Sequence, residues 1–149
     1  MNKKQEIQQS LTAAMKSRDE ATKRTLRLVL SSIKLAEVET GKELDDERIL
    51  GILQKEIKTR DDTIEESQHA HREDLVQQAQ IEKKILNRFL PEQMSADELN
   101  NLADEIIQNT GAMSMADMGK VMKELLQKLQ GRASAQDASK IVRERLQKH

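Results

Sequence analysis

The sequence has no cysteine, tryptophan or tyrosine, and its 149 residues include a single phenylalanine. Without cysteine the chain forms neither disulfides nor thiolate zinc sites, and it has no cysteine nucleophile. Because aromatic residues make up only 1% of the chain, a hydrophobic core must be aliphatic, with methionine filling its gaps. The same shortage removes base stacking, so sequence-specific recognition of single-stranded nucleic acid is not expected.

Long apolar runs are missing as well. No stretch approaches the roughly 18 apolar residues of a membrane-spanning helix, and the N-terminal segment MNKKQEIQQS lacks the apolar core of a secretory signal. These absences predict a cytoplasmic protein without membrane attachment. No stretch alternates apolar and polar residues as a strand does, and charged residues make up 34% of the chain, which favours an all-α fold.

Before Pro91, apolar residues recur every three or four positions in four stretches, and each stretch predicts an amphipathic helix. The stretches cover residues 3–17, 20–40, 45–67 and 75–89, with Gly41 ending the second and the polar segment 67–74 separating the last two. Pro91 is the only proline, and proline disfavours helix in the residue before it. It therefore marks the predicted boundary between an N-terminal domain, 1–90, and a C-terminal domain, 91–149.

Three further helices are predicted after Pro91, each opened by a serine that an acidic residue follows three positions later, as in a capping box. The pairs are Ser95 with Glu98, Ser114 with Asp117, and Ser134 with Asp137. The middle helix is expected to run from about Ser114 to Gln130, and Gly131 after it is expected to have a positive φ. The chain is therefore predicted to be all-α, with an N-terminal bundle of about four helices and a small three-helix C-terminal unit.

Basic residues are concentrated at the C-terminal end, although the net charge of the chain is only −1. Residues 91–119 carry six acidic and no basic side chains, whereas residues 120–149 carry eight basic and three acidic ones. The basic residues are Lys120, Lys123, Lys128, Arg132, Lys140, Arg143, Arg145 and Lys148. Such a set is either a solvated surface or a contact for RNA phosphates that reads shape and backbone.

Residues with catalytic or metal-binding potential are present, but their spacing does not suit those roles. His69 and His71 are two positions apart, so on a helix they point away from each other. The carboxylates of Asp61, Asp62, Glu65 and Glu66 have no nucleophile beside them and fit a solvated helix face. We therefore predict no catalytic residue, no metal site and no cofactor.

Two short motifs carry a resemblance to a known family. The run DMGKVM at 117–122, followed by GRA at 131–133, resembles the C-terminal signature of the YqeY family. That family is related to the tail of the B subunit of bacterial tRNA-dependent amidotransferases. The resemblance extends upstream through residues 25–34, 53–60 and 88–95, and so covers nearly the whole chain. Ala135 and Gln136 depart from the family's usual glycine and acidic residue, and His71 replaces a common glycine.

The resemblance implies a non-catalytic accessory module that binds tRNA or a tRNA-dependent amidotransferase-like enzyme. The catalytic body of such an enzyme is absent, so the chain is not expected to transfer amide groups by itself. Contact is expected at two glycine turns and on the basic helices around them. The predicted nucleic-acid-binding residues are Gly119, Lys120, Lys123, Gly131, Arg132, Lys140 and Arg143.

Two other functions remain open. One is a protein–protein adaptor without RNA, which docks through the N-terminal helices at Thr25–Lys34 and Lys55–Arg60. The other is an accessory to glutamine-dependent carbon–nitrogen ligation, which rests on analogy alone.

Overall fold

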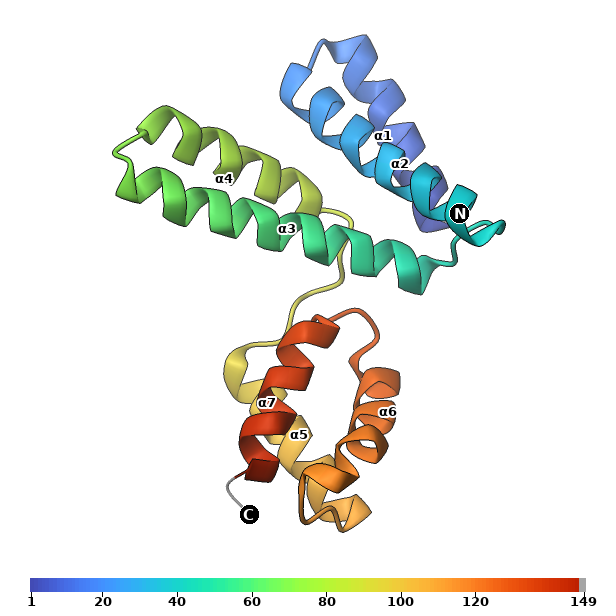
Figure 1. Ribbon diagram of the computed structural model, residues 1–149. Helices are drawn as coiled ribbons and strands as arrows, with labels where there is room; N and C mark the ends of the chain where they lie inside the picture. Colours follow the sequence, from blue (N-terminus) through green and yellow to red (C-terminus); the bar gives the residue numbers. More distant parts are fainter. Residues whose placement is uncertain (148–149) are drawn as a thin grey trace. The chain divides into compact units, whose positions relative to one another are not determined.

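The computed structural model describes residues 1–147, and within this range it contains helices and no strand (Figure 1). The α-helices are α1 (Lys3–Ser17), α2 (Glu20–Thr40), α3 (Asp46–His69), α4 (Glu73–Asn87), α5 (Ala96–Thr110), α6 (Met118–Leu129) and α7 (Ala135–Gln147), and a short 3-10 turn, η1 (Met115–Asp117), precedes α6. The all-α prediction is confirmed. The chain divides into two compact units, Met1–Pro91 and Glu92–His149, and each has its own cluster of buried apolar side chains.

The ends of α2 show how local sequence sets the helix boundaries. The Asp19 carboxylate accepts hydrogen bonds from the Thr22 amide, at 3.1 Å, and from the Thr22 hydroxyl, at 2.7 Å. These bonds hold the pKa of Asp19 below its ordinary value, the hydroxyl bond being the larger cause. At the other end Gly41 has a φ of 70°, a conformation that favours glycine. The predicted range of 20–40 is confirmed.

The turn between α3 and α4 is shorter than the polar segment predicted at 67–74. Ser67 is buried within α3, and its carbonyl accepts a hydrogen bond from the Arg72 amide at 2.9 Å. The turn itself is made around His71, which has a φ of 57°. Because α3 and α4 pack along their length, the helices continue into a segment whose composition alone predicts a loop.

The N-terminal unit consists of two helical hairpins, α1 with α2 and α3 with α4 (Figure 1). Their inward faces share the three- and four-residue spacing expected of amphipathic helices. The buried cluster is Ile7, Leu26, Val29, Ile33, Leu44, Ile49, Leu53, Ile85, Leu86 and Phe89. The single aromatic side chain is therefore part of an otherwise aliphatic core.

The C-terminal unit is a three-helix arrangement in which each of α5, α6 and α7 packs against the other two. Its buried cluster is Leu99, Ala103, Ile106, Ile107, Val121, Leu125, Leu129, Ala138, Val142 and Leu146. Both halves of the predicted Ser95–Glu98 capping box form, so the start of α5 is confirmed. Met118 and Met122 pack against the cluster, whereas Met113 and Met115 are exposed.

The start of α6 differs from the prediction. Ser114 begins the 3-10 turn instead of the α-helix, and its hydroxyl accepts a hydrogen bond from the Ala116 amide at 3.3 Å. The Asp117 carboxylate accepts from the Met113 amide at 3.0 Å, so it does not complete a box with Ser114. The capping residues are present, but they stabilise the tight turn, and α6 begins only at Met118.

The break between α6 and α7 is confirmed, and it takes two residues. Gly131 has a φ of 79°, as predicted, and Gln130 before it also has a positive φ of 50°. The Ser134 hydroxyl then accepts a hydrogen bond from the Asp137 amide at 3.1 Å at the start of α7. Two left-handed residues in succession turn the chain so that α7 packs back on α6.

One arginine is buried between the helices of the second hairpin. Arg60 on α3 is 8% exposed, and its guanidinium pairs with Glu56 on the same helix. It also lies 3.8 Å from the carboxylate of Glu82 on α4, which is 9% exposed. Removing one partner from such a group leaves a charge in a site with little water.

We predict that Arg60→Ala lowers the free energy of unfolding by about 3 kcal/mol, because Glu82 then loses the cation beside it. Urea denaturation followed by circular dichroism measures the loss. Lys58→Ala is the matched control, since Lys58 is exposed on the same helix and its replacement should stay within about 0.5 kcal/mol of the wild type. Equal stability of the two variants would contradict a structural role for Arg60.

Candidate nucleic-acid interface

Gly119 and Lys120 lie within a helix, as the apolar spacing predicted, and do not form the turn that the family resemblance implied. They are the second and third residues of α6 and are both exposed. A Cβ at Gly119 would meet nothing within 4 Å, so the backbone is open to solvent at this point. The Lys120 ammonium donates a hydrogen bond to the carbonyl oxygen of Thr110, at 3.3 Å, which directs it back over the end of α5.

Lys123 lies one helical turn beyond Gly119 on the exposed side of α6. Lys120 and Lys123 are the cationic side chains next to Gly119 on α6, and both are exposed. Lys128 differs from them, because its ammonium lies 3.9 Å from Glu124 on the same helix.

Arg132 is committed to contacts inside the C-terminal unit. Its Nε donates to the carbonyl oxygen of Glu92 at 2.9 Å, and its Nη2 donates to the carboxylate of Glu98 at 3.2 Å. Its carbonyl oxygen accepts from the Met94 amide at 2.8 Å, and the Gln93 side chain donates to the carbonyl of Gly131 at 3.0 Å. The Gly131–Arg132 turn therefore ties the segment before α5 to the segment before α7, which is a structural role that the sequence pattern did not indicate.

The carboxylate of Glu98 is held in its charged form by this arrangement. The Ser95 amide is the largest cause that keeps the pKa of Glu98 below its ordinary value, followed by the Ser95 hydroxyl, and Arg132 contributes in the same direction. One acidic side chain thus serves both the cap of α5 and the tie to Arg132.

Lys140 and Arg143 lie one turn apart on the exposed face of α7. Arg143 makes a hydrogen bond of 3.5 Å to the Ser139 hydroxyl, and neither cation forms an ion pair within residues 1–147. Arg145 is different, because its Nε lies 2.9 Å from the Asp104 carboxylate on α5. Lys148, the last basic residue of the predicted set, lies outside the described residues.

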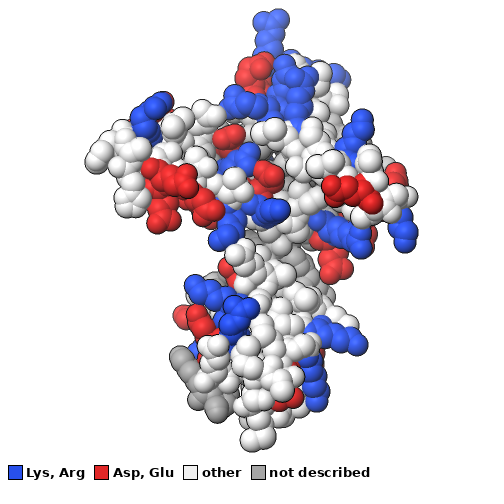
Figure 2. Space-filling model, viewed as in Figure 1, with Lys and Arg blue, Asp and Glu red and all other residues white. Residues whose placement is uncertain are grey.

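The predicted basic residues thus form two pairs, on α6 and on α7, and no single patch. In the face that Figure 2 shows, basic side chains of this unit stand in separate groups with uncharged surface between them. Residues 92–147 carry nine acidic and seven basic side chains, so the unit as a whole is not basic. An anionic partner therefore meets local positive charge on two helices and no extended basic field.

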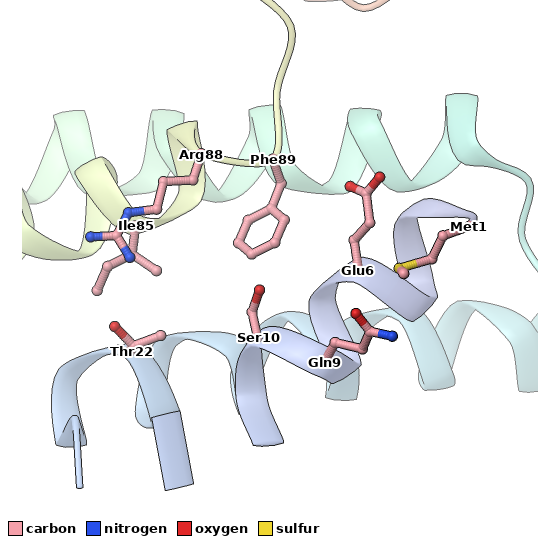
Figure 3. A pocket seen from close by; sticks show the side chains of 8 residues that line it. All are labelled: Met1, Glu6, Gln9, Ser10, Thr22, Ile85, Arg88 and Phe89. Atoms are coloured by element: carbon pink, nitrogen blue, oxygen red, sulfur yellow. The ribbon is translucent and has the colours of Figure 1, made fainter. Parts of the chain in front are cut away.

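A hollow in the N-terminal unit was not indicated by the sequence. It has a volume of about 400 Å³ and is lined by Met1, Glu6, Gln9, Ser10, Thr22, Ile85, Arg88 and Phe89 (Figure 3). Its polar groups come from α1, α2 and the end of α4, and they differ in charge.

Within residues 1–147 no group of three or more His, Asp or Glu side chains is placed to hold a metal ion.

No helix within residues 1–147 combines the length and the apolar character that a transmembrane span requires.

The chain is similar in sequence to a known protein family and to three known proteins. The family model described as "Yqey-like protein" matches residues 4–146. Over 121 residues the chain is 31% identical to "Altered inheritance of mitochondria protein 41, mitochondrial" of Lachancea thermotolerans, covering 76% of this chain and 65% of that protein. It is 38% identical over 84 residues to the protein of the same name from Kluyveromyces lactis, covering 56% of this chain and 45% of that protein. An uncharacterized protein of Schizosaccharomyces pombe is 35% identical over 89 residues, covering 60% of this chain and 72% of that protein.

These relatives contradict the cytoplasmic location predicted from the sequence. Two of them are named as mitochondrial proteins, and this overturns the prediction. The prediction used the lack of an apolar signal core, and that observation bears only on secretion. Mitochondrial transit segments are amphipathic and rich in arginine, so hydropathy alone does not reveal them.

The C-terminal unit is expected to be stable without the rest of the chain. A fragment of residues 92–149 is expected to fold by itself, because its buried cluster contains only residues of this unit. It should give a helical circular dichroism spectrum and a cooperative melting transition, and a coil spectrum would contradict a separate domain.

In this fragment Arg132→Ala is expected to lower the melting temperature by roughly 5 °C, since hydrogen bonds to Glu92 and Glu98 are lost.

Arg143→Ala is the control for this experiment, because Arg143 makes no ion pair within the described chain and its loss should change the melting temperature little.

The pH dependence of the stability of the C-terminal unit gives a second readout. Folding lowers the pKa of Glu98, so its charged carboxylate stabilises the folded state. This stabilisation is complete at pH values above the pKa in the unfolded chain, and it is lost as pH falls through the pKa in the folded chain. Glu98→Gln should therefore reduce the acid-induced loss of stability below about pH 4.5. An unchanged acid transition would show that Glu98 does not have this role.

Proposed function

Because this chain belongs to the YqeY family, whose domain is of an accessory type, we propose that it is a non-catalytic accessory module that binds tRNA through α6 and α7. The observation that carries the proposal is the outward placement of Lys120, Lys123, Lys140 and Arg143. In residues 1–147 these four cations face solvent without an acidic partner, whereas Arg132 and Arg145 are paired with acidic side chains.

The mode of binding follows from the side chains available. Lysine and arginine neutralise phosphates and release bound counterions, so affinity falls steeply as salt rises. Without Tyr or Trp, and with Phe89 in the core, there is no surface for stacking bases. Binding therefore depends on the tRNA backbone and on its shape, with two separate pairs of cations contacting different phosphates.

The relationship of the family to the tail of the amidotransferase B subunit supports an enzyme as a second binding partner of the module. The module is proposed to bring tRNA to an amidotransferase-like enzyme, and so to act as an accessory in glutamine-dependent carbon–nitrogen ligation. The match spans 65% of the Lachancea thermotolerans protein and 45% of the Kluyveromyces lactis protein, so functions that need the rest of those chains are not assigned to this one.

The tRNA proposal is tested by titrating unmodified tRNA at two salt concentrations. Two double variants, Lys120→Ala with Lys123→Ala and Lys140→Ala with Arg143→Ala, each remove one pair of cations. Each should weaken binding at low salt by about 2 kcal/mol and reduce the slope of log affinity against log salt by about 2, since each cation releases about one counterion.

Lys42→Ala is the control, because Lys42 also follows a glycine but lies in the charge-balanced N-terminal unit. It should leave tRNA binding intact. Arg132→Ala is not part of this comparison, since it is expected to change stability. If the wild type shows no salt-dependent binding at micromolar concentration, or if Lys42→Ala weakens binding as much as the double variants, the tRNA proposal is wrong.

A further inference from the structure

The outward face of α2 is unusual for the surface of a small helical unit. Leu28, Leu35 and Val38 are 50%, 62% and 72% exposed. They stand seven and ten residues apart, so they lie on one side of the helix and span about 15 Å along it. The opposite side of α2 is buried in the N-terminal core. A helix with apolar residues on both sides is typical of one that is covered on both sides.

A row of basic residues runs beside these apolar side chains. Arg27 and Lys34 are seven residues apart and exposed, and Arg24, which is also exposed, lies in line with Ser31 nearer the start of α2. None of the three takes part in an ion pair within the described residues. In Figure 2, Lys and Arg side chains gather around the turn between α1 and α2.

Ser31 occupies the position between the apolar row and the basic row, and it is exposed. At 100° per residue Ser31 lies between Leu28 and Leu35 on one side and Arg27 and Lys34 on the other. Small residues between larger ones let a second helix approach closely. The spacing of seven residues within each row is the spacing at which a packed helix repeats its contacts.

We propose that this face of α2 is a docking surface for an amphipathic helix of a partner protein that carries an apolar row and an acidic row. Leu28, Leu35 and Val38 bind its apolar side chains, and Arg27 and Lys34 pair with its carboxylates. The charge complementarity sets the orientation of the helix and excludes basic partners.

Two other occupants fit the face less well. A second copy of the chain, packed antiparallel about Ser31, would bring the Arg27–Lys34 row of one copy beside the same row of the other, and like charges oppose this contact. A lipid surface selects a wide apolar face with large or aromatic anchors. The face offers three aliphatic side chains, and the only aromatic residue, Phe89, is in the core.

The surface differs from the adaptor site predicted from the sequence. That prediction used Thr25–Lys34 and Lys55–Arg60 as whole segments. Thr25 is fully buried and Arg60 is paired inside the second hairpin, so neither is available to a partner. The proposed surface keeps only the outward residues of α2, and it is independent of tRNA binding by α6 and α7.

The test is a selection with a display library of helical peptides of about 20 residues, long enough to form a helix. The peptides share a leucine row, and the positions beside this row are randomised between Glu and Lys. The full chain is the target. Selected peptides should carry Glu along one edge, and they should bind about tenfold more weakly to Leu28→Ser with Leu35→Ser, and to Arg27→Glu with Lys34→Glu.

Matched controls are Ile81→Ser, which removes an apolar side chain that is 52% exposed on α4, and Lys58→Glu, which reverses an exposed charge on α3. Neither should change peptide affinity, and circular dichroism should show equal helicity in all variants. The proposal is overturned if no peptide is enriched, if the enriched peptides carry Lys, or if the α2 variants bind them as well as the wild type.

Two further measurements address the other occupants. Light scattering after size-exclusion chromatography would reveal a dimer that Leu35→Ser disrupts. Sedimentation with vesicles of phosphatidylcholine and phosphatidylglycerol in equal parts would reveal binding that the same variant abolishes. Either result would assign the face to a second copy or to a membrane and overturn the proposal, whereas a monomer that leaves the vesicles unbound supports it.

Discussion

The packing of narrow aliphatic stripes is the interaction on which the rest of the structure depends. Each unit buries about ten apolar side chains, and a buried Leu, Ile or Val contributes roughly 2 kcal/mol. Because the net stability of a domain is only about 5–15 kcal/mol, a loss of one or two kcal/mol from the polar interactions around such small cores is a large fraction of it. The capped helix starts, the left-handed turn at Gly131 and the ties of Arg60 and Arg132 are therefore part of what makes each unit stable.

The structure separates the basic residues into two classes. Arg60, Arg132 and Arg145 hold helices or segments together, through partners that lie on other parts of their own unit. Lys120, Lys123, Lys140 and Arg143 face solvent on α6 and α7 and form no ion pair within residues 1–147. The first class uses guanidinium groups, which donate in several directions at once, and the second is mostly lysine, a flexible point charge suited to phosphate contacts.

Local patterns predicted most of the fold. The range of α2 and the positive φ of Gly131 were predictable because they depend on neighbouring residues, such as Asp19 with Thr22. The role of Arg132 was not, because its partners Glu92 and Glu98 lie 40 and 34 residues away. Gly119 shows a different limit. The helical spacing of Met118 and Val121 predicted it inside a helix, where it lies, whereas the motif resemblance alone implied a turn.

The central claim is that α6 and α7 carry the contact with tRNA while Arg132 serves the fold. Nuclear magnetic resonance of the isotope-labelled chain, with unmodified tRNA added at low salt, tests it directly. Signals around Gly119 to Lys123 and Lys140 to Arg143 should shift or broaden, while the Nε–H signal of Arg132 stays in place because its proton is donated to Glu92. Perturbation centred on Arg132 or on α1–α4, or no perturbation at all, would contradict the claim.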